Sequence, residues 1–387
     1  MKMKRMVLVG GGHAHLAVLR RCIEEGLPDG VEAVLISPAP CHVYTGMVPG
    51  YLHGEYDVGS IGFDLPALCE AGGVKYVEAS VDRVSGRDRF VDAGERIEFD
   101  TASLDVGSIP RGALDPAVAE HAAFVRPLPQ LLSLGARLEM LERAPAGVVP
   151  IVTVVGAGAA GVEVALAIRA RLSASGRAAI VSLRDETPGV LPGFPVALRR
   201  RARSVLDAAG VQIATGERVA TVGARTIRLA DGTRVESDLT VWLTGAAPPP
   251  VLSASDLPLD SAGFFLVDQY FGSTDGSPVW GAGDCITLTN APRIARAGVY
   301  AVREGPVLAQ NLWASLGSGT MRAYLPQTDF LVALDTADSK ALLRWRGVVS
   351  HSRWALWVKR WIDRRFVKQY RDLMPRPRRG DARREVA

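Results

Sequence analysis

The chain has 387 residues, of which 48% are hydrophobic and 22% charged, with a formal net charge of +4. This composition excludes an intrinsically disordered chain and predicts a globular protein of two domains with an appendage. The four cysteines form no CxxC or CxxxxC pair and show no zinc spacing, so we expect a reducing, cytoplasmic compartment, no redox disulfide and no metal site.

The chain opens with the pattern of a strand, a glycine-rich turn, a helix and a second strand. Residues 6–9 and 31–36 are predicted strands, and residues 16–23 a predicted helix. Gly10 and Gly12 lie between the first strand and the helix, where glycine permits a tight turn and a close backbone approach to a diphosphate. The phosphates would then lie at the helix N-terminus.

Two positions depart from the usual form of this motif. His15 stands where a third glycine is common, and Ser37 stands where an acidic ribose ligand is common. An ordinary glycine-rich turn therefore remains an alternative for this segment, and packing remains an alternative role for His13 and His15.

The same order of elements returns later in the chain, with a complete motif. Residues 151–155 and 178–183 are predicted strands, and residues 162–172 a predicted helix. The three required glycines are Gly156, Gly158 and Gly161. This second unit is a strong prediction of a dinucleotide-binding fold.

Three charged residues near the second motif are candidates for function. Asp185 ends the second strand of that unit, where it would accept hydrogen bonds from the ribose hydroxyls of NAD. Its neighbour Arg184 could instead accommodate a 2′-phosphate, so NADH is only modestly favoured over NADPH. Glu163, two residues into the helix, either interacts with the helix dipole or handles a proton during reduction of an acceptor.

Residues 104–110 resemble residues 241–248, and both lie at the ends of predicted strands. We expect these to be the paired points at which the chain leaves one domain and re-enters it. A further strand at residues 278–280 leads into Gly283 and Asp284, and a long helix is predicted from about residue 297 to 316. A buried aspartate at a strand end needs hydroxyl or amide partners, and the ribityl chain of a flavin supplies hydroxyls.

Taken together, these motifs resemble those of the two-dinucleotide-binding-domain flavoproteins, the pyridine nucleotide-disulfide oxidoreductase superfamily. Within it, the sequence is most similar to type II NADH:quinone dehydrogenases and to the flavoprotein domain fused to some selenide water dikinases. The segments that carry the resemblance are residues 10–15, 44–50, 156–163, 283–284 and 297–306.

The resemblance implies an α/β fold of two Rossmann-like domains and a C-terminal amphipathic helical tail. The expected parts are an FAD domain made of residues 1–112 and 253–325, an NAD(P) domain at 113–252, and a C-terminal region at 326–387. The implied FAD contacts are Gly10, Gly12, His15, Ser37, Thr45, Val81, Gly107, Ser108, Gly283, Asp284, Ala297 and Gly298. The implied NAD(P) contacts are Gly156, Gly158, Gly161, Asp185 and Gly245.

The activity implied is that of an FAD-dependent NAD(P)H dehydrogenase, with Glu163 and Tyr44 as catalytic residues. Hydride would pass from NAD(P)H to FAD and electrons then to a quinone-like acceptor. The quinone is an inference, because the Ala-Gln-His signature expected near residues 295–305 is absent. One alternative is a sulfide:quinone-type reductase that uses Cys41 and Cys285, although both cysteines could simply be small buried side chains. Another alternative is a flavin-bearing partner module linked to selenium metabolism.

The C-terminal region is strongly basic. From Arg344 onward, 14 Lys and Arg accompany 4 Asp and Glu. Trp354, Trp357 and Trp361 share one face of a predicted helix, which favours a peripheral position on the anionic inner face of the cell membrane. Docking on the FAD domain or on the partner of a homodimer is the alternative. No nucleic-acid-binding fold accompanies the basic residues, and residues 376–387 are predicted to be disordered.

Overall fold

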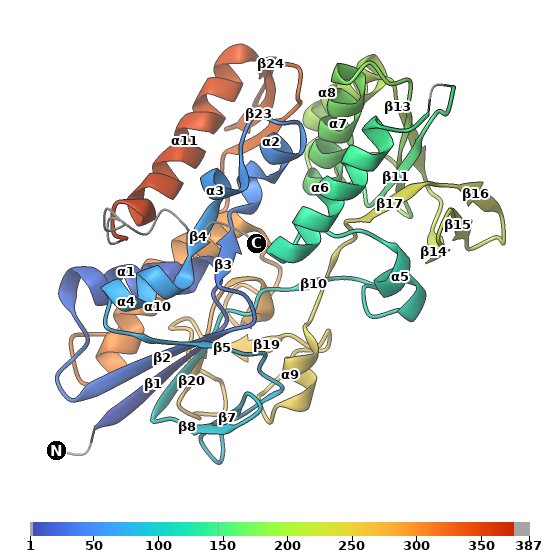
Figure 1. Ribbon diagram of the computed structural model, residues 1–387. Helices are drawn as coiled ribbons and strands as arrows, with labels where there is room; N and C mark the ends of the chain where they lie inside the picture. Colours follow the sequence, from blue (N-terminus) through green and yellow to red (C-terminus); the bar gives the residue numbers. More distant parts are fainter. Residues whose placement is uncertain (1–2, 146, 375–387) are drawn as a thin grey trace, which may run out of the picture.

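The computed structural model describes residues 3–145 and 147–374 and has a mixed α/β fold built around two parallel sheets (Figure 1). The first sheet has the strand order β20-β9-β1-β2-β5. Its strands are β1 (Lys4–Val9), β2 (Val31–Ser37), β5 (Lys75–Glu78), β9 (Thr101–Leu104) and β20 (Val279–Gly281). Since β20 pairs in parallel with β9, a strand from late in the chain completes the sheet that begins at Lys4, as the sequence predicts.

The helices α1 (His13–Glu25), α4 (Leu65–Ala71) and α10 (Gly298–Ser315) belong to this first unit. The apolar side of α1 is buried and packs closely against α10. Because α1 begins directly after Gly12, its N-terminus lies at the carboxyl end of β1. This is the edge of a parallel sheet at which ligands bind in doubly wound folds.

The second sheet has the strand order β13-β12-β11-β17, again all parallel. Its strands are β11 (Ile151–Val155), β12 (Ile180–Asp185), β13 (Val211–Thr215) and β17 (Leu239–Trp242), and its helices are α6 (Leu128–Glu142), α7 (Ala159–Ala174) and α8 (Val196–Ala209). A hairpin turns at Asp231 and Gly232 between β15 (Thr226–Leu229) and β16 (Arg234–Glu236), and β15 also pairs with β14 (Val219–Val222).

The two connections between the units run side by side. The strand β10 (Ile109–Pro110) pairs antiparallel with β18 (Ala246–Ala247). These are the two segments that the sequence predicts as paired crossover points. Figure 1 shows β10 in the segment that joins the first sheet to the second unit.

Shorter elements complete these two units. The strands are β3 (Cys41–Val43), β4 (Gly62–Asp64), β6 (Arg83–Ser85), β7 (Phe90–Asp92), β8 (Arg96–Glu98), β19 (Phe265–Val267) and β21 (Ile286–Leu288). The helices are α2 (Val48–Leu52), α3 (Val58–Ile61), α5 (Pro116–His121) and α9 (Pro250–Ala254), with 3-10 turns at Thr45–Met47 and Gly283–Cys285.

The C-terminal region holds a sheet that the sequence did not predict, followed by the helix that it did. Strands β22 (Val332–Asp335), β23 (Ala341–Trp345) and β24 (Val348–Ser352) form an antiparallel sheet ahead of α11 (Arg353–Arg371). One face of α11 is buried against the protein, through Ala355, Leu356, Lys359, Asp363, Phe366, Val367 and Tyr370. The three tryptophans of α11 lie on the opposite, exposed face. Within the described ranges, the helices are too short or too polar to cross a membrane, and the predicted disorder of residues 376–387 falls outside them.

Candidate active site

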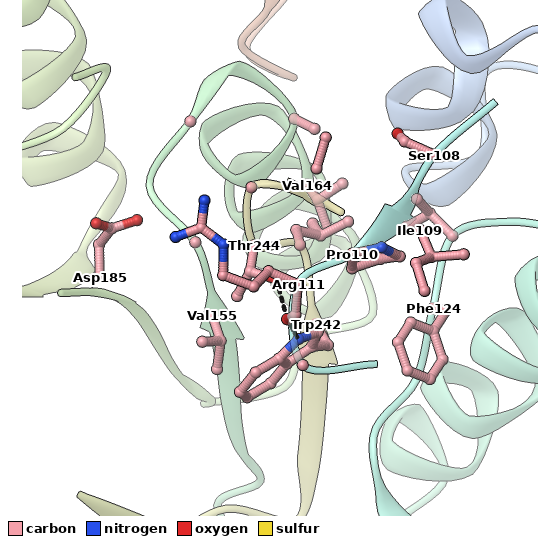
Figure 2. Close-up of a pocket in the computed structure, with 18 of the residues that line it drawn as sticks. Ser108, Ile109, Pro110, Arg111, Phe124, Val155, Val164, Asp185, Trp242 and Thr244 are labelled. Atoms are coloured by element: carbon pink, nitrogen blue, oxygen red, sulfur yellow. Dashed lines mark hydrogen bonds between the residues drawn. The ribbon is translucent and has the colours of Figure 1, made fainter. Parts of the chain in front are cut away.

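A cavity of about 730 Å³ lies between the two units (Figure 2). Ten of the predicted site residues line it, namely Thr45, Ser108, Gly156, Gly158, Glu163, Asp185, Gly245, Asp284, Ala297 and Gly298. The predicted residues that do not line it are Gly10, Gly12, His15, Ser37, Tyr44, Val81, Gly107, Gly161 and Gly283. One continuous space therefore runs from the second glycine-rich turn to the start of α10.

The wall of the cavity includes residues for which no site role was predicted. Trp242 donates from Nε1 to the Arg111 carbonyl oxygen at 2.8 Å, and Thr244 donates to the same oxygen at 2.7 Å. Figure 2 shows these side chains between Asp185 on one side and Phe124 on the other. They come from the paired connections between the units, so only the three-dimensional fold brings them to the site.

The end of β12 carries an acidic edge of the cavity. The Asp185 carboxylate accepts hydrogen bonds from the backbone N–H of Ala157 at 2.6 Å and of Thr187 at 2.7 Å. Arg184 points instead toward Glu217, with 2.5 Å between its Nη1 and the Glu217 Oε2. The guanidinium is thus neutralised by a carboxylate, and Glu186 and Glu217 also line the cavity here.

Glu163 lies in the first turns of α7, half-buried at the cavity wall. Its Oε1 accepts a hydrogen bond from the backbone N–H of Asp335 at 2.7 Å. Burial raises the pKa of Glu163 to about 7, although the nearby Lys359 ammonium opposes the shift. A carboxyl group with this pKa holds or releases a proton near neutral pH.

A buried lysine from α11 reaches the same region, and sequence reasoning missed it. Lys359 Nζ donates to the Gly46 carbonyl oxygen at 2.6 Å and to Asp363 Oδ2 at 2.8 Å. The Tyr44 hydroxyl donates to Asp363 Oδ1 at 3.1 Å. Burial, reinforced by Asp363, raises the pKa of Tyr44, so its phenol stays protonated. In the sequence this Lys–Asp pair looks like part of a solvated basic tail.

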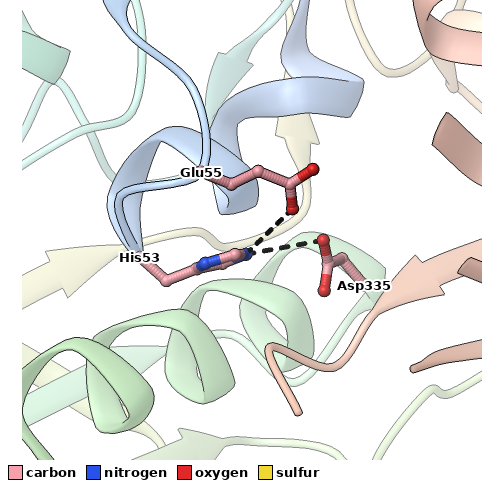
Figure 3. Close-up of side chains that lie close together, drawn as sticks. All are labelled: His53, Glu55 and Asp335. Carbon is pink, nitrogen blue, oxygen red and sulfur yellow. Dashed lines mark ion pairs between the residues drawn. The ribbon is translucent and has the colours of Figure 1, made fainter. Parts of the chain in front are cut away.

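Next to this network, three potential metal ligands meet: His53, Glu55 and Asp335 (Figure 3). His53 Nε2 lies 3.5 Å from Asp335 Oδ2 and 3.9 Å from Glu55 Oε2. Glu55 Oε2 also pairs with the Arg360 guanidinium at 2.5 Å. With a cation of α11 already on Glu55, we interpret the group as a polar contact network that joins the segment after α2 to β22 and α11.

The side chain of His15 packs against the first glycine-rich turn. Its ring nitrogens lie 2.6 Å from the Gly10 carbonyl oxygen and 2.9 Å from Ser103 Oγ, and the side chain is fully buried. Both nitrogens are therefore used within the protein, which favours packing over a side-chain contact with a ligand. Ser37 is buried as well and donates to the Ala39 carbonyl oxygen at 3.1 Å.

The two cysteines considered for sulfide chemistry do not line the cavity. Cys285 is fully buried and its thiol donates to the Ala282 carbonyl oxygen at 3.2 Å. Burial raises the pKa of both the Cys285 and the Cys41 thiols. Thiols in such surroundings are poor nucleophiles.

Comparison with known proteins adds to this geometry. The family model described as pyridine nucleotide-disulphide oxidoreductase matches residues 4–311. The NADH dehydrogenase-like protein YutJ of Bacillus subtilis is 26% identical over 312 residues, which cover 80% of this chain and 84% of that protein. The alternative NAD(P)H-ubiquinone oxidoreductase C1 of Arabidopsis thaliana is 24% identical, and the match covers 82% of this chain and 68% of that protein.

Among solved structures, the sulfide:quinone oxidoreductase of Aquifex aeolicus is similar in fold, with a TM-score of 0.79 and 17% sequence identity. The match covers 96% of this chain and 92% of that protein. At this identity the likeness concerns the fold alone.

Proposed function

Because the chain belongs to the pyridine nucleotide-disulphide oxidoreductase family, we propose that it is an FAD-dependent NAD(P)H dehydrogenase that reduces a quinone-like acceptor. The observation that carries the proposal is the single cavity lined both by the second glycine-rich turn and by the residues expected around a flavin. Two relatives, an NADH dehydrogenase-like protein and an NAD(P)H-ubiquinone oxidoreductase, agree with it. Bound FAD supplies the redox chemistry, which is hydride acceptance from nicotinamide and electron transfer to the acceptor.

The residues of the first unit fit a flavin. Thr45, Ser108, Asp284 and the N-terminal residues of α10 line one end of the cavity, and Ser108 Oγ donates to Asp284 Oδ2 at 3.3 Å. These groups offer hydrogen bonds to ribityl hydroxyls and a helix N-terminus toward the ring. At Gly12 and Gly283 a Cβ would meet the Asp105 carboxyl group, so the backbone is drawn in tightly where a diphosphate is expected. We assign residues 1–112 and 253–325 to FAD on this basis.

The second unit, residues 113–252, is assigned to the nicotinamide dinucleotide. Gly156 and Gly158 form the turn under its diphosphate, and Asp185 faces its adenosine ribose. We propose NADH as the physiological donor. Arg184 is engaged by Glu217, and the neighbouring carboxylates would repel a 2′-phosphate.

Within this scheme the chain's own side chains position the rings and move protons. Glu163 holds a proton near neutral pH at the cavity wall and delivers it as the acceptor is reduced. Tyr44, whose hydroxyl is committed to Asp363, positions the loop that contains Thr45. Val164 and Phe124 line the cavity, and their apolar side chains help to exclude water from it.

Anaerobic stopped-flow spectroscopy tests the proposal. NADH added to the flavin-loaded protein should bleach the flavin absorbance within the time of a turnover, and a quinone added afterwards should restore it. If neither NADH nor NADPH reduces the flavin, the proposed activity is wrong. Reduction by sulfide instead would favour the sulfide:quinone alternative, which the buried, high-pKa Cys285 disfavours.

The partner-module alternative linked to selenium metabolism predicts a different result. It requires slow nicotinamide oxidation with every quinone and tight binding to a partner protein. The lining of the cavity by Gly156, Gly158 and Asp185 disfavours it, because a module without turnover has little use for a nicotinamide site.

The exposed face of α11 supports a peripheral position on the inner, anionic face of the cell membrane, in the cytoplasm. Trp354, Trp357 and Trp361 are 53%, 67% and 52% exposed. The same helix surface carries the basic residues Arg353, Arg364, Arg365 and Lys368. Tryptophan prefers the membrane interface and basic side chains prefer anionic headgroups.

A triple substitution to Gln at these three tryptophans tests the membrane contact. Wild-type protein should sediment with vesicles rich in anionic lipid, and the triple variant should stay in solution while still accepting electrons from NADH. Trp345→Gln is the control, because Trp345 is 50% exposed on β23 and off the helix. Unchanged sedimentation would contradict the membrane contact, and a changed oligomeric state would favour a homodimer.

A further inference from the structure

Asp105 is a buried carboxyl group at the carboxyl end of β9 for which the sequence suggested no role. It is 3% exposed, and its Oδ2 accepts hydrogen bonds from the backbone N–H of Ala14 at 2.7 Å and of His15 at 2.9 Å. These N–H groups belong to the first turn of α1. In dinucleotide-binding folds the free N–H groups and the dipole of this helix end attract the diphosphate. In this chain an internal carboxyl group already uses two of them.

Asp105 also lies between two glycines of the flavin site. A Cβ built on Gly12 would overlap its carboxyl group, and a Cβ built on Gly283 would lie 2.6 Å from Oδ1. Both backbone segments are therefore packed directly on this side chain. A diphosphate bound by the turn at Gly12 and by the segment at Gly283 would have Asp105 as its neighbour.

The surroundings of Asp105 are acidic and carry little compensating charge. Asp284 follows Gly283, and Glu304 of α10 accepts from the Gly283 N–H at 2.6 Å. Burial raises the pKa of Asp105 to about 7 and that of Glu304 to about 8, and the neighbouring carboxyl groups add to both shifts.

Two further titratable side chains beside Asp105, His15 and Cys285, supply no positive charge near neutral pH. Burial lowers the pKa of His15 to about 4 and raises that of the Cys285 thiol. Of the cations near Asp284, Arg296 lies 3.9 Å from Asp260, and Arg126 donates to Ser108 Oγ at 3.2 Å. Within residues 3–145 and 147–374, Asp105 has no ion pair with a Lys or Arg side chain.

We propose that Asp105 is part of the diphosphate site for FAD and binds the diphosphate as the neutral acid, so that FAD binding takes up a proton from solvent. The neutral group keeps its carbonyl oxygen on the Ala14 and His15 N–H groups and gains one O–H donor for a phosphate oxygen. The carboxylate has no donor and would add a third negative charge beside the two of the diphosphate. The inference rests on the proposed FAD cofactor.

FAD retention at different pH values tests the inference. Flavin-loaded protein is diluted into buffers from pH 6 to pH 9, and free FAD is measured in the ultrafiltrate. The affinity should fall by up to about tenfold per pH unit above pH 7, because one protonation is linked to binding. Calorimetry at pH 8 in two buffers of different ionisation enthalpy should show uptake of about one proton per FAD rebound.

Two matched variants locate the proton. Asp105→Asn keeps the size, the oxygen acceptor and an N–H donor, so it should bind FAD with little dependence on pH and at least about tenfold more tightly than wild type at pH 9. Glu304→Gln removes the neighbouring high-pKa carboxyl group and should leave the pH dependence of wild type.

Three results would overturn the inference. They are equal wild-type affinity at pH 6 and pH 9, no proton uptake, or loss of the pH dependence in Glu304→Gln alone. The proton-uptake measurement uses wild-type protein and holds even if Asp105→Asn does not fold. A protein that retains and rebinds no FAD at any pH would instead reject the proposed flavin function itself.

Discussion

Replacing Lys359 by Met should destabilise the protein by about 3–5 kcal/mol. Lys359 and Asp363 form an ion pair of 2.8 Å in which the two side chains are only 9% and 7% exposed. Methionine keeps most of the side-chain volume but leaves the Asp363 carboxylate buried, with the Tyr44 hydroxyl as its remaining donor. The loss of stability arises mainly from this uncompensated charge, because a buried carboxylate without a cation has lost its hydration and has no ion pair to replace it.

Urea unfolding followed by circular dichroism measures the change, and the same helix provides the control. Lys368 and Asp372 have the same spacing and a 2.7 Å contact but are 72% and 59% exposed, so Lys368→Met should cost less than about 0.5 kcal/mol. The double variant Lys359→Met/Asp363→Asn leaves no buried charge and should recover most of the loss, to within about 1–2 kcal/mol of wild type. Equal destabilisation by the two lysine substitutions, or a double variant no more stable than Lys359→Met, would refute the reasoning.

Three further predictions concern catalysis and the second glycine-rich turn. Glu163→Gln should slow acceptor reduction more than flavin reduction. In wild type, acceptor reduction should slow above about pH 7, because the acid form of Glu163, whose pKa is raised to about 7, is lost there. Equal slowing of both half-reactions in stopped flow would assign Glu163 to nicotinamide binding. Glu217→Gln should free Arg184 and raise the NADPH-to-NADH ratio of kcat/KM about tenfold, and a ratio within twofold of wild type would contradict this role for Arg184. Gly161→Ala should lower the free energy of unfolding by at least about 2 kcal/mol, because its Cβ would overlap the Gly156 carbonyl oxygen. Gly158→Ala has open space around its Cβ and should change only the KM for NADH. Equal melting temperatures for the two variants would count against this account.

Much of the fold could be predicted because local patterns repeat. The two glycine-rich turns predict the two parallel sheets. The two similar segments, residues 104–110 and 241–248, predict the paired crossover points, where Ile109 pairs with Ala247. The sheet β22–β24 could not be predicted in this way. Its strands have at most five residues, and its tight turn at Arg346 and Gly347 depends on positive φ angles of 45° and 82°. An arginine does not predict a positive φ angle in the way that a glycine or asparagine does.

The site was predictable only where residue type and backbone conformation coincide. Glycines at tight turns and acids at strand ends satisfy local demands, and Gly156, Gly158 and Asp185 line the cavity. Lys359 and Asp105 do not follow local rules. Charged side chains are ordinarily solvated, so their burial depends on partners distant in sequence, such as Gly46 for Lys359 and Ala14 for Asp105.

The paired connections β10 and β18 have a consequence for how substrates reach the cavity. A single two-stranded ribbon between two units would normally permit them to swing apart. Here the C-terminal sheet contacts α7 and α8 of the second unit, while α11 contacts β4 of the first. The two units are thus tied at a second place, and swinging would break buried contacts. We expect the backbone of the nucleotide-bound form to lie within about 1 Å of the free form. Donor and acceptor would then diffuse into a cavity that is already formed before they bind.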